Sequence, residues 1–482
     1  MNAADWKAPA NDGEILVQPS LDQLAIDARE NHRWLTDLDI KIAGQPFSVW
    51  RRQMRRILGQ ADPDQLLICS GHQTELYHPG VWIKLALMDR LAKNTDGRAL
   101  QISVDSDSPK HLSLRYPGGS VDITPELSAQ VQWSGLLRSP KSEYLQSVQK
   151  KIEEVRRWDF GSLLPDFVAN LIQHSNGAVN LPQALAEAMQ ELDQNLGLSY
   201  EVTMSQPIWA SEPFLAFVLH LLNSADEFAR CYNQALAVYR QRERIKSPGR
   251  PMPDLAIEAG KIELPFWLDD LSNGGRERLN VEIANGRATL NVKNKTIDCT
   301  HISASELVAV CSENQIRVAP RALTLTMFLR LFACDQWIHG IGGAHYDQIT
   351  DQIIRDFFHI DPPKFGVATA TLFFPASGRL RISLSEVRHQ RHQTIHHVLN
   401  GGKEKYLQEI ATAPRRSLQR AEVFTAMHRA MDEANSRGLE DWNRQWAGLQ
   451  HRAMEDDTIF NRELFYAIQP AERLMNLTCS LD

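Results

Sequence analysis

Five of the sixteen histidines in the chain fall in or beside three loops that an α/β sheet would gather at one edge. A histidine near neutral pH can donate hydrogen bonds to phosphate oxygens or carry protons between reacting groups. Taken singly, each of them is more often a satisfied polar residue than a catalyst, so their convergence is the signal. The five are His72, His78, His111, His339 and His345.

The first loop joins a predicted strand to a predicted helix. Leu66–Cys69 is a short, continuous apolar run, as in a buried strand, and Pro79-Gly80 opens a second apolar run, Val81–Ala92, that suits a buried helix. Such a loop lies at the carboxyl end of a parallel strand, and the free N–H groups of the following helix favour anions. We therefore expect its polar and glycine residues to bind a substrate or a nucleotide phosphate: Gly71, His72, Gln73, His78, Gly80 and Lys84.

The second loop carries a pair of carboxylates. Ala99–Val104 is predicted to be the next core strand, and Asp105 and Asp107 follow it directly, with His111 a few residues further on. A carboxylate at the end of a core strand suits a catalytic group or a ribose-binding group. A solvated turn is an equally good explanation, because Asp and Ser are common turn residues.

The third loop is rich in glycine. Trp337–His339 is predicted to be a strand that enters Gly340, Gly342 and Gly343, and an amphipathic helix with His345 near its start follows. Glycine lets a backbone approach a phosphate closely, but the run matches neither the dinucleotide fingerprint nor the Walker A loop, and a tight turn without a ligand is as good an explanation. A short predicted strand, Ile316–Val318, precedes Arg321, which we expect to bind the same substrate.

The elements that must position these residues predict an α/β fold with a parallel sheet and several insertions. Arg51, Arg52, Arg55 and Arg56 are predicted to lie on a solvated helix face rather than in an anion site. Asn285-Gly286 predicts a β-hairpin. The expected parts are a helical lead-in (1–60), the first half of the core (61–135), a helical insertion (136–255), a small β subdomain (256–312), the second half of the core (313–384) and a helical C-terminal region (385–482).

Length and composition limit the classes of protein to which the chain can belong. A chain of 482 residues is too long for one ordinary core, and its net charge of -7, with no long Lys/Arg block, argues against nucleic acid or an anionic membrane as the main partner. The start lacks a signal peptide, and no apolar run approaches the roughly 20 residues of a membrane span, so a cytoplasmic protein is expected. The six cysteines are scattered, which predicts reduced thiols and no structural metal.

Taken together, the motifs resemble the bacillithiol-synthesis cysteine-adding enzymes (BshC-like proteins). The family's Gly-Gln-Gln loop, Thr-Gly-Pro element and helical Lys are similar to Gly71-His72-Gln73, His78-Pro79-Gly80 and Lys84. Its acidic strand end resembles Asp105-Ser106-Asp107, and its Tyr-Val-Gly-Gly segment resembles the stretch from Phe332 to Tyr346. Glycine order and several acidic and histidine positions differ from the family pattern.

The resemblance implies a Rossmann-like core akin to nucleotidyl-transferring synthetases, an adenine-nucleotide site, and amide formation between cysteine and an amino-sugar conjugate. It also implies a homodimer formed through the C-terminal helices. The leading hypothesis is therefore a ligase or nucleotidyltransferase that binds ADP, ATP or another phosphorylated small molecule, with Mg²⁺ as an additional cofactor candidate.

In this hypothesis the catalytic residues are His72, Asp105, Asp107 and His345. The altered acidic and histidine positions favour a second hypothesis, a metabolite-binding protein that keeps the fold without turnover. A metal-dependent hydrolase that uses the histidines is the third and weakest.

Overall fold

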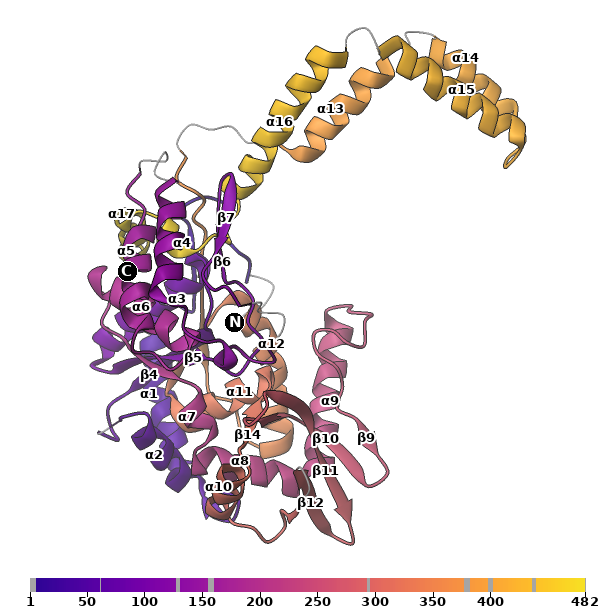
Figure 1. Cartoon of the computed structure of the whole chain (residues 1–482). Coiled ribbons are helices and arrows are strands. Elements are labelled where there is room, and N and C mark those ends of the chain that lie inside the picture. The colour runs from indigo at the N-terminus through magenta and orange to yellow at the C-terminus, as the bar shows by residue number, and fades with distance from the viewer. Residues whose placement is uncertain are drawn as a thin grey trace. The chain divides into compact units, whose positions relative to one another are not determined.

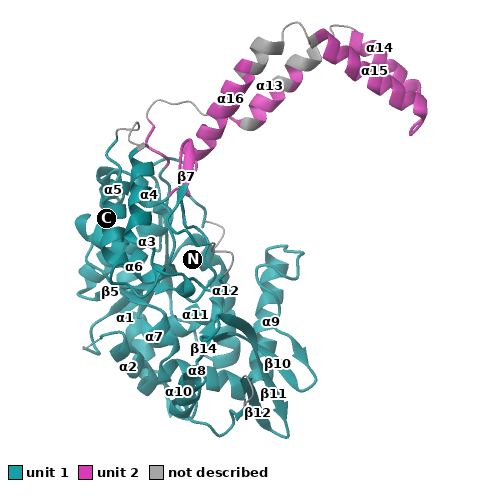
Figure 2. Ribbon diagram, in the orientation of Figure 1, with its two compact units in different colours: residues 1–114, 121–372, 465–482 teal, residues 115–120, 373–464 magenta. Residues whose placement is uncertain are grey.

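The computed structural model describes residues 6–60, 62–126, 131–154, 160–292, 295–376, 382–397, 402–435 and 439–481 (Figure 1). The chain divides into two compact units, which are coloured separately in Figure 2. The first comprises Met1–Leu114, Val121–Leu372 and Phe465–Asp482, and the second comprises Arg115–Ser120 and Phe373–Leu464.

A six-stranded, mostly parallel sheet forms the centre of the first unit. Five strands run parallel, and the edge strand β1 pairs with β16 in the antiparallel sense. The chain builds the sheet outward from β4, first to one side through β5 and β8, and later to the other through β15 and β16. The order across the sheet is β1 (Ile15–Gln18), β16 (Phe365–Ala370), β15 (Gln336–His339), β4 (Leu67–Gln73), β5 (Arg98–Val104) and β8 (Glu201–Met204).

The predicted helix of the first loop is confirmed as α3 (Pro79–Thr95). Twelve of its seventeen residues are buried, as expected of a helix that is covered on most sides. One side packs against β4, β5, β15 and β16, and the others contact α1 (Leu21–Asp37) and α17 (Ala471–Cys479). Trp82, Ile83 and Leu87 are fully buried as a result. This packing fixes the start of α3 beside the carboxyl end of β4.

The helical insertion contains one strand that the sequence analysis placed within a helical stretch. β8 is four residues long and only half-buried, so it carries a weak strand signal, yet it forms an edge of the central sheet. Likewise β1 lies within the expected helical lead-in. The helices of this insertion are α4 (Ser142–Glu154), α5 (Leu164–Ser175), α6 (Leu181–Asn195), α7 (Gln206–Trp209), α8 (Glu212–Asn223) and α9 (Ala225–Arg242).

A second sheet is antiparallel and follows the order β13-β12-β11-β10-β14, with β9 (Ile257–Glu258) paired to β10. The predicted hairpin is confirmed, because Asn285 and Gly286 both adopt positive φ between β11 and β12. The strand expected in the second half of the core, Ile316–Pro320 (β14), instead pairs with β10 of this sheet. The other strands are β10 (Lys261–Asp270), β11 (Gly275–Ala284), β12 (Arg287–Val292) and β13 (Lys295–Asp298).

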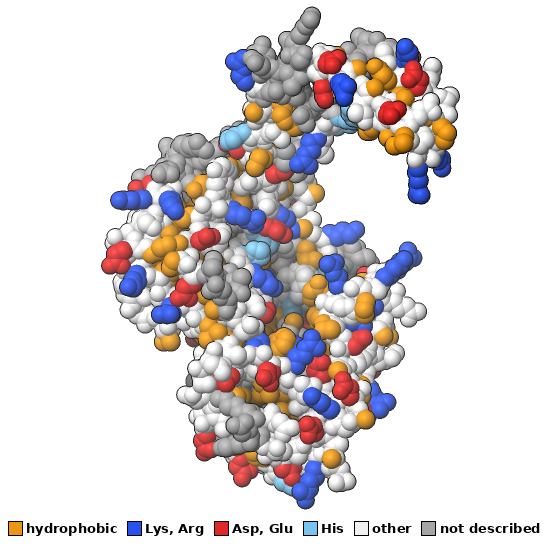
Figure 3. Space-filling view, turned by 45° about the vertical axis from the view of Figure 1, so that its right-hand side comes forward, with side chains coloured by type: hydrophobic (Ala, Val, Ile, Leu, Met, Phe, Trp, Pro, Cys, Tyr) orange, Lys and Arg blue, Asp and Glu red, His pale blue; other side chains and the backbone are white. Residues whose placement is uncertain are grey.

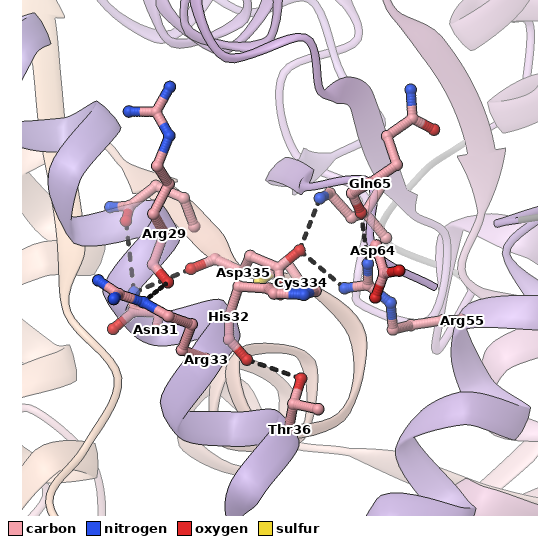
Figure 4. A network of polar contacts seen from close by, with 12 residues as sticks. Arg29, Asn31, His32, Arg33, Thr36, Arg55, Asp64, Gln65, Cys334 and Asp335 are labelled. Carbon is pink, nitrogen blue, oxygen red and sulfur yellow. Dashed lines mark hydrogen bonds and ion pairs between the residues drawn. The ribbon is translucent and has the colours of Figure 1, made fainter. Parts of the chain in front are cut away.

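The arginines of α2 (Phe47–Ile57) correct another expectation. Arg51 and Arg55 are buried, and their guanidinium groups lie 2.5 and 2.8 Å from the carboxylate oxygens of Asp335. His32 and the backbone N–H of Leu67 bind the same carboxylate, so four groups converge on it. Figure 4 shows two of them, His32 and Arg55, beside Asp335. The predicted solvated face is therefore wrong for these two arginines, which join α2 to the amino-terminal edge of the central sheet.

The second unit is largely helical. It contains α13 (Leu384–His397), α14 (Gly402–Thr412), α15 (Leu418–Asn435) and α16 (Leu439–Ile459), with α14 packed on α15 and α13 on α16. Several large apolar side chains on these helices are exposed, among them Leu418, Phe424 and Met454. Across the described residues, no helix combines the length and the apolar character that crossing a membrane would require.

Candidate functional site

The first and third loops of the sequence analysis lie at the ends of neighbouring parallel strands. β4 pairs with β15 up to Ser70 and Ile338, and β4 then continues for three residues along β5 alone. A Cβ atom on Gly71 would lie 2.9 Å from the indole ring of Trp337 and 3.2 Å from the carbonyl oxygen of Ile102. The close approach of the strands thus requires glycine at this position.

Lys84 is a buried cation between these two loops. Its Nζ atom reaches from α3 to the carbonyl oxygen of Gly71 at 3.0 Å, and no carboxylate of the described residues lies within ion-pair distance of it. Burial lowers the pKa of Lys84 to about 8, against a smaller upward effect of Glu75. A buried ammonium group with one protein acceptor has room for two more hydrogen bonds, and a negatively charged ligand would relieve its desolvation.

His72 is held as a neutral imidazole. Its Nδ1–H donates to the carbonyl oxygen of Gln73 at 2.9 Å, which leaves the lone pair on Nε2. Burial, with further contributions from Lys84, His78 and His111, holds the pKa of His72 well below its usual value. The side chain retains 25% of its surface exposure, so Nε2 can accept a proton or a hydrogen bond from a ligand.

Glu75 lies in the same loop and was not singled out from the sequence, where it is one acid in a polar stretch. It is buried, and its carboxylate accepts a hydrogen bond from the backbone N–H of His111 at 3.4 Å. Burial raises the pKa of Glu75, while His111 and Lys110 act in the opposite direction. The loop therefore combines a neutral histidine, a buried acid and a buried lysine, which is a pattern of acid–base sites.

The end of β15 is held by a buried network. His339 receives a hydrogen bond on Nδ1 from the indole N–H of Trp337, so its Nε2–H donates to Asp347 at 2.8 Å. Arg330 lies 2.5 Å from the same carboxylate, and its charge helps to hold the pKa of Asp347 well below its ordinary range. Burial lowers the pKa of His339. Both ring nitrogens of His339 form hydrogen bonds within the protein, so neither is available to a ligand. His339 therefore positions the third loop, between β15 and α12.

The glycine run differs from the expected loop. Gly340 is the N-cap of α12 (Ile341–Ile353), so Gly342 and Gly343 belong to the first helical turn and none of the three has positive φ. A Cβ atom on Gly340 would lie 3.7 Å from Cδ of Lys84, which places the start of α12 next to this lysine. The N-terminus of α12 therefore replaces the expected glycine cradle.

His78 and Gly80 serve the start of α3. The Nδ1 atom of His78 accepts a hydrogen bond from the backbone N–H of Gly80 at 3.1 Å, so His78 is the N-cap, and Pro79 follows as the first helical residue. Gly80 is buried in this first turn. His78 thus contributes to the site chiefly by fixing where α3 begins.

Only one of the two predicted carboxylates reaches the first loop. Asp107 accepts a hydrogen bond from the side-chain amide of Gln73, and it is half-buried. Asp105 is buried and accepts a hydrogen bond from the hydroxyl of Ser205, which follows β8, at 2.6 Å. Burial raises the pKa of Asp105. Asp105 therefore stabilises the second loop through its hydrogen bond with Ser205, on the side of β8.

Two other predicted residues have partners elsewhere. The ring of His345 packs against Trp6 with 5.4 Å between ring centroids. Arg321 lies just after β14, where it ion-pairs with Glu263 at 2.8 Å and stacks over Trp267. No described contact joins either residue to Lys84 or His72.

Comparison with known proteins gives no family for the chain: no family model matches it, and no curated protein does. Among the described residues, no group of three or more histidine, cysteine, aspartate or glutamate side chains is arranged to hold a metal ion.

Proposed function

We propose that the chain is an enzyme of the ligase or nucleotidyltransferase type, and that it binds an adenine nucleotide or another phosphorylated small molecule at the ends of β4 and β15. The observation that carries the proposal is the buried Lys84 ammonium, which has the Gly71 carbonyl as its acceptor and no carboxylate partner among the residues that the structure describes. It lies where the strand order reverses, the usual ligand position of open parallel sheets. The same strand order supports a Rossmann-like core.

The residues present fit a phosphate group. Lys84 would hold a phosphate oxygen, with the N-termini of α3 and α12 supplying further N–H donors and favourable dipoles. Asp107, at the mouth of the site, would orient the second substrate or bind Mg²⁺ together with the phosphate. Positioning and electrostatic stabilisation would supply most of the catalysis.

His72 suits the positioning of the attacking group in an acyl transfer. Its neutral Nε2 atom would accept a hydrogen bond from an attacking amine, and Glu75 lies 3.7 Å from Nδ1. In the reaction suggested by the sequence resemblance, the acceptor is an amino sugar conjugate and the donor is cysteine or another amino acid. The carboxylate of the donor would first take the γ-phosphoryl group of ATP, which leaves ADP. Attack of the amine on this acyl phosphate would then form the amide and release inorganic phosphate, which carries away the proton of the amine.

A metabolite-binding protein without turnover is the second candidate. It is favoured by the positions of Asp105 and His345, two of the four expected catalytic residues, which are engaged with Ser205 and Trp6. Product formation separates the two candidates. If a His72→Ala variant binds ligand as the unmodified protein does and neither protein turns over any amino acid and amino-sugar pair, the binding function is the better description.

The direct test is calorimetric titration with ADP and ATP, with and without Mg²⁺. We expect saturable binding that weakens at least tenfold in Lys84→Met, a variant of similar side-chain volume without the charge. Lys93→Met is the matched control, because Lys93 lies on the same helix but is half-exposed and pairs with Asp89. Absence of binding to either nucleotide under both conditions would refute the nucleotide proposal.

A further inference from the structure

The second sheet has one apolar face and one face crowded with arginine. Along β10, Leu264, Phe266 and Leu268 alternate with Trp267 and Asp269; Leu264, Phe266 and Asp269 are buried, and Trp267 and Leu268 are half-buried. The register places Arg276 opposite Asp269 and Arg278 opposite Trp267 from β11. From the other side, β14 brings Arg317 opposite Asp269, and Arg321 follows two residues after the partner of Trp267.

We call this set the arginine face: Arg276, Arg278, Arg317, Arg321 and Trp267. Guanidinium groups and indole rings alternate along it in a continuous stack. Arg321 lies 4.4 Å from the ring centroid of Trp267, and Arg276 lies 5.4 Å from the same ring. Trp133 then continues the stack, with Arg276 at 5.1 Å and Arg317 at 5.0 Å.

The two ends of the arginine face differ in charge balance. At the Trp133 end, Arg276 and Arg317 are buried and both bind Asp269, at 2.6 and 2.7 Å, and the carboxylate of Asp105 lies close to Arg317. At the Trp267 end, Arg278 and Arg321 share the single carboxylate of Glu263, at 3.2 and 2.8 Å. Arg278 keeps 53% of its side-chain exposure, so the positive charge in excess is accessible there.

Two hydrogen bonds connect the arginine face to the proposed site. An Nη2–H group of Arg276 donates to the carbonyl oxygen of Ser106 at 2.7 Å. The next residue, Asp107, accepts the hydrogen bond of Gln73, which is adjacent to His72. The arginine face therefore borders the same loop that carries Asp107.

We propose that the Trp267 end of the arginine face binds the acidic group of the second substrate, a carboxylate or a phosphate. This inference rests on the proposed function and adds that the acceptor is an anion. Arg278 contributes hydrogen-bond donors to the acidic group, and the half-buried indole of Trp267 supports the adjacent part of the ligand. Glu263 holds Arg278 and Arg321 in place, as a buried carboxylate between two cations.

The test uses the full chain and two simple probes, succinate for a carboxylate and inorganic phosphate for a phosphate, each titrated calorimetrically at low salt. We expect saturable binding of at least one probe, and the probe that binds more tightly identifies the acidic group. Arg278→Ala is expected to weaken that binding at least fivefold and Arg278→Lys to restore part of it. Arg230→Ala, in an exposed ion pair on α9, is the control and is expected to leave it unchanged.

ADP titrations of the same proteins keep this inference separate from the proposed function. We expect Arg278→Ala to change ADP affinity less than twofold, whereas Lys84→Met should weaken it at least tenfold. If the unmodified protein binds ADP but neither probe, or if Arg278→Ala binds the probe as tightly as the unmodified protein does, the anionic subsite is refuted while the nucleotide site stands. If ADP fails to bind and Arg278-dependent probe binding persists, the nucleotide proposal fails and the anion site is retained.

Discussion

At the residue scale, Lys84 makes the affinity for a phosphorylated ligand depend on pH. Its pKa of about 8 means that the unliganded site loses its positive charge as the pH rises above that value. A bound anion stabilises the charged form, so binding takes up a proton there. We expect ADP affinity to be steady up to about pH 8 and then to fall by about tenfold per pH unit, measured by calorimetry between pH 6.5 and 9.5.

The same lysine makes the stability of the fold depend on pH in the opposite direction. Its pKa lies below the unfolded value of about 10.4, so the unfolded state binds more protons between these limits and the free energy of unfolding rises with pH across that window. In Lys84→Met we expect neither the rise in the free energy of unfolding with pH nor the fall in ADP affinity with pH. ADP affinity that stays level through pH 9.5 would show that Lys84 does not contact the ligand.

Gly71 and Gly342 form a matched pair for a stability test. An alanine Cβ at Gly71 would meet the Trp337 ring at 2.9 Å, so β4 and β15 would have to separate, and we expect Gly71→Ala to lower the free energy of unfolding by about 1–3 kcal/mol. At Gly342, in the first turn of α12, nothing lies within 4 Å of the added atom, and alanine should be neutral or stabilise by up to about 1 kcal/mol. Urea denaturation measures both, and equal effects would contradict this packing.

The sequence predicted the site unevenly. Gly71, Gln73 and Lys84 could be found because a strand, a polar loop and an apolar helix fix where such residues must lie. Asp105 and Asp107 looked equivalent, since the hydroxyl that engages Asp105 comes from Ser205, about a hundred positions away. Contacts of that range leave no local pattern.

At the element scale, the carboxylate of Asp335 joins α1 and α2 to the central sheet. Asp335→Asn would leave Arg51 and Arg55 buried with no carboxylate between them, and we expect a loss of about 3–5 kcal/mol in the free energy of unfolding. Asp226→Asn breaks an exposed ion pair on α9 and should change it by no more than about 0.5 kcal/mol. Denaturant titration at pH 7 compares the two, and a loss below 1 kcal/mol for Asp335→Asn would contradict a role in joining these elements.

Lowering the pH should reproduce part of the loss in the free energy of unfolding that we expect for Asp335→Asn. The hydrogen bond from His32 and the charges of Arg51 and Arg55 lower the pKa of Asp335 to about 2, below its value of about 3.9 in an unfolded chain. The contribution of this group to stability is therefore complete above about pH 4 and declines as the pH falls toward 2. In Asp335→Asn that part of the acid dependence should be absent.

Two strands were predicted incorrectly: β8 was missed, and β14 was assigned to the wrong sheet. β8 has four residues and lies between longer helices, so its alternation was hidden in a helical stretch. β14 is continuously buried and reads as a parallel core strand, yet it closes the antiparallel second sheet beside β10. Burial is readable from a sequence, but the identity of the pairing partner is set by tertiary contacts.

At the whole-molecule scale, the pattern of strands, loops and helices correctly indicated an α/β chain, and the structure divides into two compact units. Charges of both signs are interspersed over the face in Figure 3, without a large area of one sign.

The second unit provides the last prediction, which concerns assembly. Leu407, Leu418, Phe424, Leu449 and Met454 are large apolar side chains exposed on its helices, and we propose that a second copy of the chain covers them. We expect the full chain to be a homodimer by light scattering. The backbone N–H of Phe374 donates to the carbonyl oxygen of Ile459 at 3.0 Å, so a short Gly-Ser linker can replace residues 376–457. Because the first unit has its own core, this deletion should give a monomer that keeps ADP binding within about twofold, whereas a deletion variant that stays dimeric would place the interface on the first unit.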